Sequence, residues 1–596
     1  MLQKFQTQIE KNLALDNYFE EMEIGRDYYK FIMIKESHSM AIYKCIRRQS
    51  EQDYIVYRIP YKRISKTQSL QLSIPYQIEK LNQIRLANII HPENIYYEQN
   101  YTYMTQSTYL NNFQLLNQRN TLHEQKQLFI ITQLCITLQE LQKRNFPPYI
   151  LNLNNIYIIE NVLHLSFLHF KFDEIGSCDF ESFQQFVHKY FSIANKYCIN
   201  NYESTTDKLI EILKLDYFDQ GCPHLNYVKI LFQIENIESK LRGCNSFTFS
   251  TKKPALFSIY PQAKNHIFIK VPRIMDDNLE VIEYRQLQNQ RELQFNEQLQ
   301  NSSKFATFLS YLRIQKHLFF FYQEYPLTLD QLFEDSNQKI LLKKLQYKFA
   351  MQLAMALSEL HKKQILHRDI KPQNIFLTSV DIEKANIKLA DFDRSRRIKT
   401  EQIYEQKDFY LEDSSEENTI FSSTYNYNPP ESFGTIYDFS SDIWQFGLTL
   451  FQMANNGIYP PVKKAMLFDP EEYSNINLNL ISSVLNQELK EQTLHQDYII
   501  LISRCLESQS DKRISLNDFI SNLKNIRINI KDQDDVIIPD DYYDYSDQST
   551  GSFDQAICWQ KFQKFSRPKI PNCNLRQLNQ LSGDTLQFLK DQLLNI

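Results

Sequence analysis

The amino-acid sequence predicts an α+β protein in which one fold occurs twice in tandem. The first observation is an internal repeat: LSELHKKQILHRDIKPQNIFL, starting at Leu357, aligns without gaps on LQELQKRNFPPYILNLNNIYI, starting at Leu138. The second is that each stretch continues a helical spacing of apolar residues and then changes to a loop and a short apolar strand. The third is the length of 596 residues, which exceeds what a single core supports. Together they indicate two copies of one structural unit.

The helical spacing defines the approximate extent of each copy. It is formed by Leu342, Leu345, Phe349, Leu353, Ala356 and Leu360 in the second copy, and by Ile131, Leu134, Leu138 and Leu141 in the first. We therefore expect a leader at 1–23, a first copy at 24–240, a second copy at 243–527, and an acidic linker with a helical tail at 528–596.

Composition and charge exclude several classes of protein. The 66 Lys and Arg residues nearly balance the 71 Asp and Glu residues, so the net charge of −5 provides no basic field for nucleic acid or a membrane surface. Nine scattered cysteines without a Cys-x-x-Cys pair indicate neither a disulfide framework nor a zinc site. No apolar run approaches the roughly 18 residues of a membrane span. These features predict an intracellular protein, in the cytoplasm or alternatively the nucleus.

The run HRDIKPQN, residues 367–374, places a carboxylate, an ammonium and an amide at fixed offsets between a predicted helix and a predicted strand. It resembles the catalytic loop HRDxKxxN of eukaryotic protein kinases. The resemblance implies that Asp369 accepts the proton of the substrate hydroxyl, Lys371 contacts the γ-phosphate of ATP, and Asn374 holds Mg²⁺. A lysine two positions after the aspartate is typical of the serine/threonine branch. The resemblance also implies that each copy is bilobal, with a small β-rich N-lobe and a helical C-lobe.

A second motif, Asp391-Phe392-Asp393, follows the apolar strand IKLA and resembles the magnesium-binding DFG motif of the same family. Asp391 is the expected metal ligand. Asp393 replaces a glycine, and since aspartate tolerates left-handed backbone better than most residues, we expect the turn to survive with altered inward or outward flipping.

Upstream, the strand pattern HIFIKV contains one charge, Lys270, at the position of the kinase strand lysine that orients the α- and β-phosphates. Its expected partner is Glu292 in a following helix, with Glu297, about a turn further on, as the alternative. The phosphate-covering loop matches the family least well, because it keeps one glycine, Gly243, and an aromatic tip, Phe247. The missing glycines predict weaker ATP binding or slower turnover.

Further residues follow in the family's order. Glu324 and Tyr325 resemble the hinge that binds adenine. The stretch from Thr424 to Glu431 resembles the peptide-docking end of the activation segment, which disfavours a small-molecule or lipid hydroxyl as acceptor. The last two expected positions are Asp442, on a buried helix, and Arg513, as the partner of Glu431.

The activation segment offers candidate phosphorylation sites. Because Arg368 precedes the catalytic aspartate, the family pattern implies a cation that binds a phosphate on this segment. Ser422 and Ser423 are the preferred candidates, whereas Ser414 and Ser415 lie in an acidic stretch that suits a separate acidophilic kinase.

The first copy lacks these chemical groups. In the gapless alignment His367, Arg368, Asp369 and Lys371 fall on Pro148, Tyr149, Ile150 and Asn152, and only Asn155 is kept. Ser166 stands where the metal aspartate is expected, and Arg58 replaces the strand lysine. The first copy therefore resembles a pseudokinase domain; an unrelated helical α+β domain is the alternative.

The sequence as a whole predicts a serine/threonine protein kinase that uses ATP and Mg²⁺, acts on protein substrates, and is regulated in cis by contact with its inactive first copy. No nucleic-acid partner and no membrane span are expected. The competing interpretation is a nucleotide-binding pseudokinase scaffold with negligible transfer. Retention of Lys270, Asp369, Asn374 and Asp391 together favours the enzyme, because a scaffold has no physical need of all four.

Overall fold

The computed structural model describes the following parts of the chain: 18–36, 40–60, 82–98, 101–107, 114–115, 124–144, 156–159, 162–166, 180–199, 246–257, 265–273, 279–334, 336–398, 427–429, 438–455, 457–458 and 495–530, with short pieces elsewhere between 78 and 239. All of them belong to one compact unit, residues 1–540. Most of the expected leader, and the tail beyond residue 530, lie outside the described residues.

A five-stranded antiparallel sheet forms the N-terminal part, with the strand order β1-β2-β3-β6-β5. A short helix, α2 (Glu23–Asp27), precedes it. The strands are β1 (Tyr28–Glu36), β2 (Ala41–Arg47), β3 (Asp53–Pro60), β5 (Asn94–Tyr97) and β6 (Tyr101–Ser107). Alternate residues of β2, namely Ala41, Tyr43 and Cys45, are buried on one face, as a half-buried strand requires.

A second five-stranded antiparallel sheet has the order β10-β11-β12-β14-β13, which repeats the order of the first. Its strands are β10 (Glu238–Ser239), β11 (Ser246–Lys252), β12 (His266–Pro272), β13 (Phe308–Ile314) and β14 (His317–Gln323). The helix α9 (Leu279–Leu299) lies between β12 and β13 in the chain. Because β10 pairs with β11, this sheet begins before the boundary at residue 243 that the sequence suggested.

Each part also contains a long helix followed by a β-hairpin. In the N-terminal part these are α4 (Glu124–Lys143), β8 (Ile156–Ile159) and β9 (Val162–Ser166), with β7 (Gln114–Leu115), β4 (Ile89–Ile90), α5 (Phe180–Tyr190) and α6 (Ile193–Lys196) beside them. In the C-terminal part they are α10 (Ser336–Lys362), β17 (Ile375–Leu377) and β18 (Ile387–Leu389), with β15 (Leu327–Thr328) pairing with β17 and β16 (Ile365–Leu366) pairing with β19 (Arg396–Arg397). The order β7-β8-β9 within the four-stranded sheet β4-β9-β8-β7 corresponds to the order β15-β17-β18 of the three-stranded sheet.

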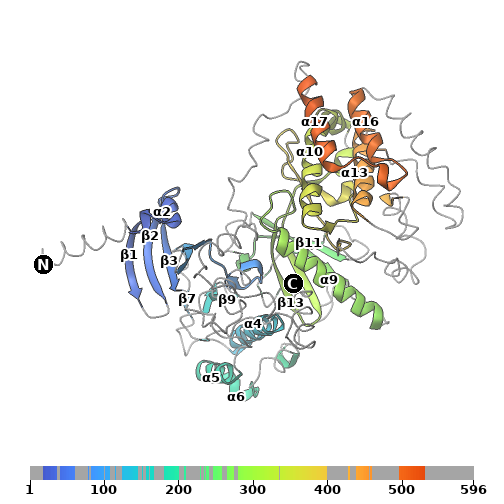
Figure 1. The fold of residues 1–596 in the computed structure, drawn as a ribbon. Helices are drawn as coiled ribbons and strands as arrows, with labels where there is room; N and C mark the ends of the chain where they lie inside the picture. Colours follow the sequence, from blue (N-terminus) through green and yellow to red (C-terminus); the bar gives the residue numbers. More distant parts are fainter. Residues whose placement is uncertain are drawn as a thin grey trace, which may run out of the picture. The chain divides into compact units, whose positions relative to one another are not determined.

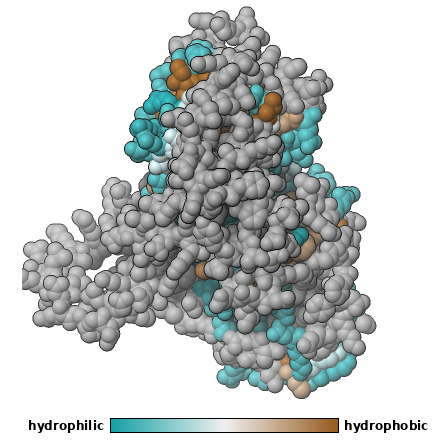
Figure 2. Space-filling model, turned by 90° about the vertical axis from the view of Figure 1, so that its right-hand side faces the viewer, coloured by the Kyte–Doolittle hydropathy of each residue, from teal (hydrophilic) through white to brown (hydrophobic). Residues whose placement is uncertain are grey.

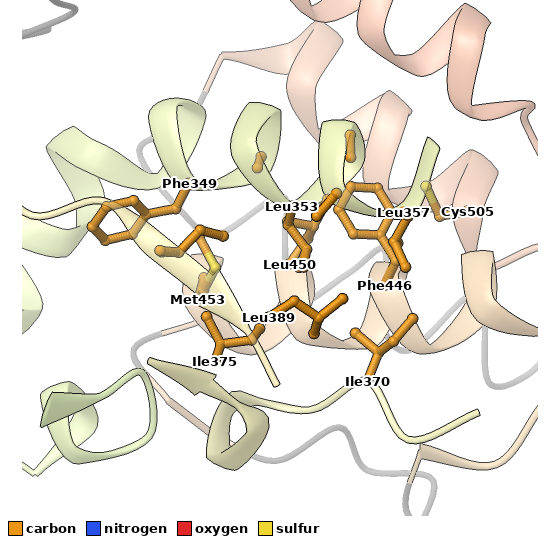
Figure 3. Packing of buried hydrophobic residues seen from close by; sticks show 14 of the residues in the cluster. Phe349, Leu353, Leu357, Ile370, Ile375, Leu389, Phe446, Leu450, Met453 and Cys505 are labelled. Atoms are coloured by element: carbon orange, nitrogen blue, oxygen red, sulfur yellow. The ribbon is translucent and has the colours of Figure 1, made fainter. Parts of the chain in front are cut away.

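Of the C-terminal helices, α13 (Phe439–Ala454) and α17 (Leu516–Ile530) pack against α10, and α16 (Gln496–Cys505) packs against α13 and α17 (Figure 1). The short 3-10 helices η6 (Gln331–Phe333), η7 (Pro372–Asn374) and η11 (Ser510–Lys512) belong to this part, whereas η5 (Ala255–Phe257) lies between β11 and β12 in the chain. Phe349, Leu353 and Leu357, four residues apart on α10, point toward side chains of α13 and of the hairpin (Figure 3). Gly447 of α13 lies so close to α16 that a Cβ there would meet the Cβ of Cys505 at 2.7 Å.

Another apolar cluster is formed jointly by the two parts of the chain. It combines Leu128, Ile131, Leu134 and Leu138 of α4 with Leu293 of α9, Phe308 and Tyr311 of β13, and Leu318 and Phe320 of β14. Residues of both sequence copies therefore share one core.

The visible surface of the described residues is mainly polar (Figure 2). On the face shown in Figure 2, hydrophilic side chains predominate among the described residues and apolar ones form small separate patches. Within the described residues, no helix is both long enough and apolar enough to cross a bilayer.

Candidate active site

The loop that follows α10 is held in place by two side chains of α13. The backbone N–H groups of His367 and Arg368 donate to the carboxylate of Asp442, each at 2.9 Å. The N–H of Ile370 donates to Oε1 of Gln445 at 2.9 Å. Asp442 is fully buried. Its carboxylate therefore supplies hydrogen-bond acceptors to backbone N–H groups that would otherwise be unpaired in the loop.

Asp369 lies at the centre of this loop and is 3% exposed. Its Oδ2 accepts hydrogen bonds from Nζ of Lys371 at 2.8 Å and from Nδ2 of Asn374 at 2.9 Å. Burial opposes ionisation of Asp369, but the Lys371 ammonium outweighs it and lowers the pKa to about 2. Asp369 is therefore a carboxylate at neutral pH, and its buried Oδ1 has no partner among the described residues.

Lys270 of β12 joins two carboxylates from distant parts of the chain. Its Nζ lies 2.7 Å from Oε1 of Glu292 on α9 and 2.6 Å from Oδ1 of Asp391. Burial disfavours the charged lysine, yet Asp391 and Glu292 together raise its pKa well above the ordinary value. Glu297, the alternative partner, instead binds Arg144 at 2.9 Å.

Three carboxylates converge beside this lysine. Oxygen atoms of Asp369, Asp391 and Asp393 all lie within 4.8 Å of one another. Burial, and then the negative charge of Asp391, raise the pKa of Asp393 to about 6. Oδ1 of Asp393 and Oδ1 of Asp369 are buried and have no partner within the described parts of the chain. Since clustered carboxylates are ligands that Mg²⁺ favours, the residues present fit a divalent cation.

In the Asp391-Phe392-Asp393 segment, Phe392 packs into the interior and Asp391 faces Lys270. Phe392 is 2% exposed, and its ring centroid lies 5.3 Å from that of His367 and 5.7 Å from that of Phe305. Asp391 has a left-handed backbone with φ of 69°. The aspartate at position 393 is thus compatible with this packing.

Phe247 differs from its sequence-based prediction. It lies within β11, paired with Val271, and is 9% exposed, rather than forming the tip of a phosphate-covering loop. The reason is strand alternation, because Phe247 and Phe249 both face the apolar cluster of this sheet. Thr248, on the opposite face, is the residue that pairs with Lys270.

Three further residues predicted from the sequence have defined partners, two of them just after β14 and one beside α13. Glu324 follows β14, and its Oε2 accepts a hydrogen bond from Ser250 at 2.5 Å. The hydroxyl of Tyr325 bonds Oγ1 of Thr307 at 2.9 Å. Arg513 donates to the carbonyl oxygen of Ser440 at 3.0 Å.

Several predicted positions lie outside the described residues. They are Gly243, Ser414, Ser415, Ser422, Ser423, Thr424 and Glu431 in the second copy, and Pro148, Tyr149, Ile150, Asn152 and Asn155 in the first. Arg58 lies on β3, where its guanidinium binds Glu36 at 2.7 Å. Ser166 is the last residue of β9.

Sequence reasoning missed two features of this site. It treated Asp393 only as a substitute for glycine, although its position two residues from Asp391 could have indicated a further metal ligand. It also gave no role to Gln445, because nothing local in the sequence connects that residue with the loop 75 positions earlier.

Comparison with known proteins agrees with this geometry. The family model described as "Protein kinase domain" matches residues 273–523, a range that begins just after Lys270. Serine/threonine-protein kinase ULK3 of Homo sapiens is 29% identical over 185 residues, which are 31% of this chain and 34% of that protein. MAP kinase kinase skh1/pek1 of Schizosaccharomyces pombe is 32% identical over 168 residues, which are 28% of this chain and 40% of that protein.

A third relative is serine/threonine-protein kinase Nek9 of Mus musculus, with 27% identity over 165 residues, 28% of this chain and 14% of that protein. The matched part of this chain thus spans less than half the length of each of these three relatives. The family model covers the C-terminal part of the chain, which carries Asp369 and Asp391.

Proposed function

Because this chain belongs to the eukaryotic protein kinase superfamily through residues 273–523, we propose that it transfers the γ-phosphate of ATP to serine or threonine hydroxyls of proteins. One observation carries the proposal: Asp369 is a buried carboxylate that stays ionised beside Lys371 and Asn374 and lies within reach of Asp391. A domain with a purely structural role would have no need of a buried, ionised carboxylate at this position.

Each residue has a distinct part in the proposed transfer. Asp369 accepts the proton of the attacking hydroxyl, and Lys371 offsets negative charge on the phosphoryl group as it moves. Lys270, held by Glu292, orients the α- and β-phosphates. Asp391, Asp393 and Oδ1 of Asn374 would hold Mg²⁺, which when bound neutralises phosphate charge.

For residues 24–240 we propose a kinase-like domain without transfer chemistry that regulates the second copy in cis. The identical strand order of the two five-stranded sheets supports this proposal. So does the common succession of a long helix and a β-hairpin, α4 with β8 and β9 against α10 with β17 and β18. The sequence supports the lack of chemistry, since Ile150 replaces the base.

The competing function is a nucleotide-binding scaffold. It is favoured by the loss of glycines around Gly243, which leaves the phosphates with fewer close backbone N–H groups. The two functions differ in one measurable quantity, the rate of phosphate transfer.

The test uses the full chain with labelled ATP, Mg²⁺ and a generic protein acceptor. We expect label on serine and threonine, and we expect Asp369→Asn to abolish transfer while nucleotide affinity stays nearly unchanged, because only the base is removed. Asp381→Asn is the matched control, since Asp381 is an exposed carboxylate that binds Lys384 outside the site. Wild-type and Asp369→Asn proteins with equal transfer rates would refute the assignment of the base.

A further inference from the structure

The helix α9 presents two different faces. One face carries Glu292, which binds Lys270, and Asn296, whose amide donates to the hydroxyl of Tyr322 at 2.7 Å. The other carries Gln290, Leu293 and Glu297, three and four residues apart, as the side chains of one helical stripe are. The first face belongs to the candidate active site. Contacts made by the second face can therefore fix the position of the helix without occupying that site.

The second face of α9 is bound by charged residues of α4 and β13. Arg144, which follows the last residue of α4, donates from Nη1 to Oε2 of Glu297 at 2.9 Å and from Nε to Oε1 of Glu140 at 3.3 Å. Oε2 of Glu140 accepts from Nε of Arg313 at 2.8 Å, and Arg313 also donates to Gln290 at 2.6 Å. These contacts connect one turn of α4 with two positions on α9.

This ionic network is buried, and its charged groups are paired with one another. Glu140 and Glu297 are 3% and 8% exposed, and the hydroxyl of the fully buried Tyr311 donates to Oε1 of Glu140 at 3.0 Å. The Arg144 guanidinium also lies over the Tyr311 ring, 5.0 Å from its centroid. Buried charges interact strongly only when their partners are held in place, so displacement of α9 would leave Glu297 or Arg144 desolvated and unpaired.

Apolar and backbone contacts also join α9 to the N-terminal part of the chain. Leu293 enters the apolar cluster that includes Leu134 and Leu138 of α4. Just beyond α9, Nε2 of Gln300 donates to the carbonyl oxygen of Gln83 at 3.0 Å. The whole stripe from Gln290 to Gln300 therefore contacts either the N-terminal part of the chain or Arg313, which that part holds.

We propose that Arg144 and Glu140 are positioning residues that fix α9 so that Glu292 stays on Lys270, which makes the N-terminal part of the chain an activator of the kinase domain in cis. This inference rests on the proposed kinase function and adds the direction of regulation. Its physical basis is differential contact: the network is formed in the arrangement in which the Lys270–Glu292 pair is also formed, so it favours that arrangement over any in which α9 has moved.

The experiment compares Arg144→Met with wild type in the full chain by amide hydrogen exchange and by phosphate transfer. We expect faster exchange confined to residues 279–299, unchanged exchange in α17, and a transfer rate lower by about tenfold. Arg144→Lys should retain part of the rate. Arg58→Met is the matched control, since Arg58 is paired with Glu36 on the other sheet.

The Glu292→Gln background distinguishes positioning from a general loss of stability. If Arg144 acts through the Lys270–Glu292 pair, Arg144→Met should add little to the effect of Glu292→Gln. The proposal would be overturned if Arg144→Met reduced the transfer rate by the same factor in the wild-type and the Glu292→Gln backgrounds. Unchanged hydrogen exchange in α9 would also overturn it. If Arg144→Met does not fold, Glu297→Gln, which keeps the shape of the side chain, supports or refutes it by the same measurements.

Failure of the kinase proposal would be seen separately. A wild-type chain that transfers no phosphate contradicts the enzyme, whereas the exchange of α9 in Arg144→Met still decides whether the network fixes this helix.

Discussion

At the scale of single residues, the site is a balance of charges around Lys270. Two carboxylates, Glu292 and Asp391, bind its ammonium, and two more, Asp369 and Asp393, lie close by. Each substitution in this group therefore changes the electrostatic environment of the others as well as its own contacts.

Asp391→Asn tests the proposed metal ligand. Removing one carboxylate charge should weaken Mg²⁺-dependent binding of ATP, with a smaller effect on nucleotide binding in the presence of a chelator. Isothermal titration with and without Mg²⁺ measures both affinities. If neither the Mg²⁺ affinity nor the transfer rate changes, Asp391 does not hold the metal.

Asp393→Gly restores the residue that the resembling family carries at this position. We expect affinity for Mn²⁺ alone, without nucleotide, to fall on the order of tenfold, because the site keeps two of its three carboxylates. Electron paramagnetic resonance of free Mn²⁺ measures this directly. Equal affinity in both proteins would show that Asp393 is not a ligand, and Asp381→Asn again serves as the control.

At the scale of elements, α13 determines the shape of the loop that carries Asp369. Asp442, in its first turn, accepts both backbone N–H groups of His367 and Arg368 and a bond from the His361 ring at 3.0 Å. A capping box made by Asp438 and Ser441 fixes where this helix begins. The loop geometry therefore depends on a helix that follows it by about 70 residues in the chain.

Asp442→Asn should lower the free energy of unfolding by roughly 2 to 4 kcal/mol, because an amide NH₂ group would face backbone donors in a buried site. Urea unfolding measures it, with the exposed Asp511→Asn as the control. Burial opposes ionisation of Asp442, but its hydrogen bonds, foremost that from His361, lower the pKa below its ordinary value.

That direction predicts a pH dependence. A carboxylate with a lowered pKa stabilises the folded state above the ordinary pKa of about 4, and this contribution is lost as the pH falls through the folded-state value. The difference in stability between wild type and Asp442→Asn should therefore shrink below about pH 4. A difference that stays constant down to the acid transition would contradict this account.

At the scale of the whole molecule, the two sequence copies share an apolar core in addition to the clusters that each has of its own. The apolar cluster around α4 takes in Leu293 of α9 and Phe320 of β14. Residues 1–540 accordingly form one compact unit. Cutting the chain near residue 243 would remove part of the second sheet and expose buried apolar side chains, so the full chain is the appropriate object of experiments.

Leu134→Ala tests this shared core. Leu134 is fully buried on α4, and its truncation should cost about 2 to 5 kcal/mol of stability. We expect one shifted thermal transition in calorimetry and faster hydrogen exchange in α9 as well as in α4. The exposed Lys126→Ala on the same helix is the control. Two transitions, of which only one shifts, would show that the parts unfold independently.

The sequence by itself determined the family and the groups close together in the chain. HRDIKPQN places Asp369, Lys371 and Asn374 within six residues, so the turn that joins them is local and its chemistry can be predicted from residue types. The kinase resemblance predicted from this run is confirmed by the family match at 273–523. The order of the two sheets could not be predicted in the same way, because strand pairing depends on contacts far apart in sequence.

Only the tertiary structure decided which partners these groups meet. Glu292 and Glu297 lie about a turn apart on one helix, so spacing left both available to Lys270, and packing against α4 turned Glu297 toward Arg144. Phe247 was expected at a loop tip, and pairing with Val271 placed it in a strand. The physical reason is the same in each case: burial and charge pairing act between segments that only the folded chain brings together.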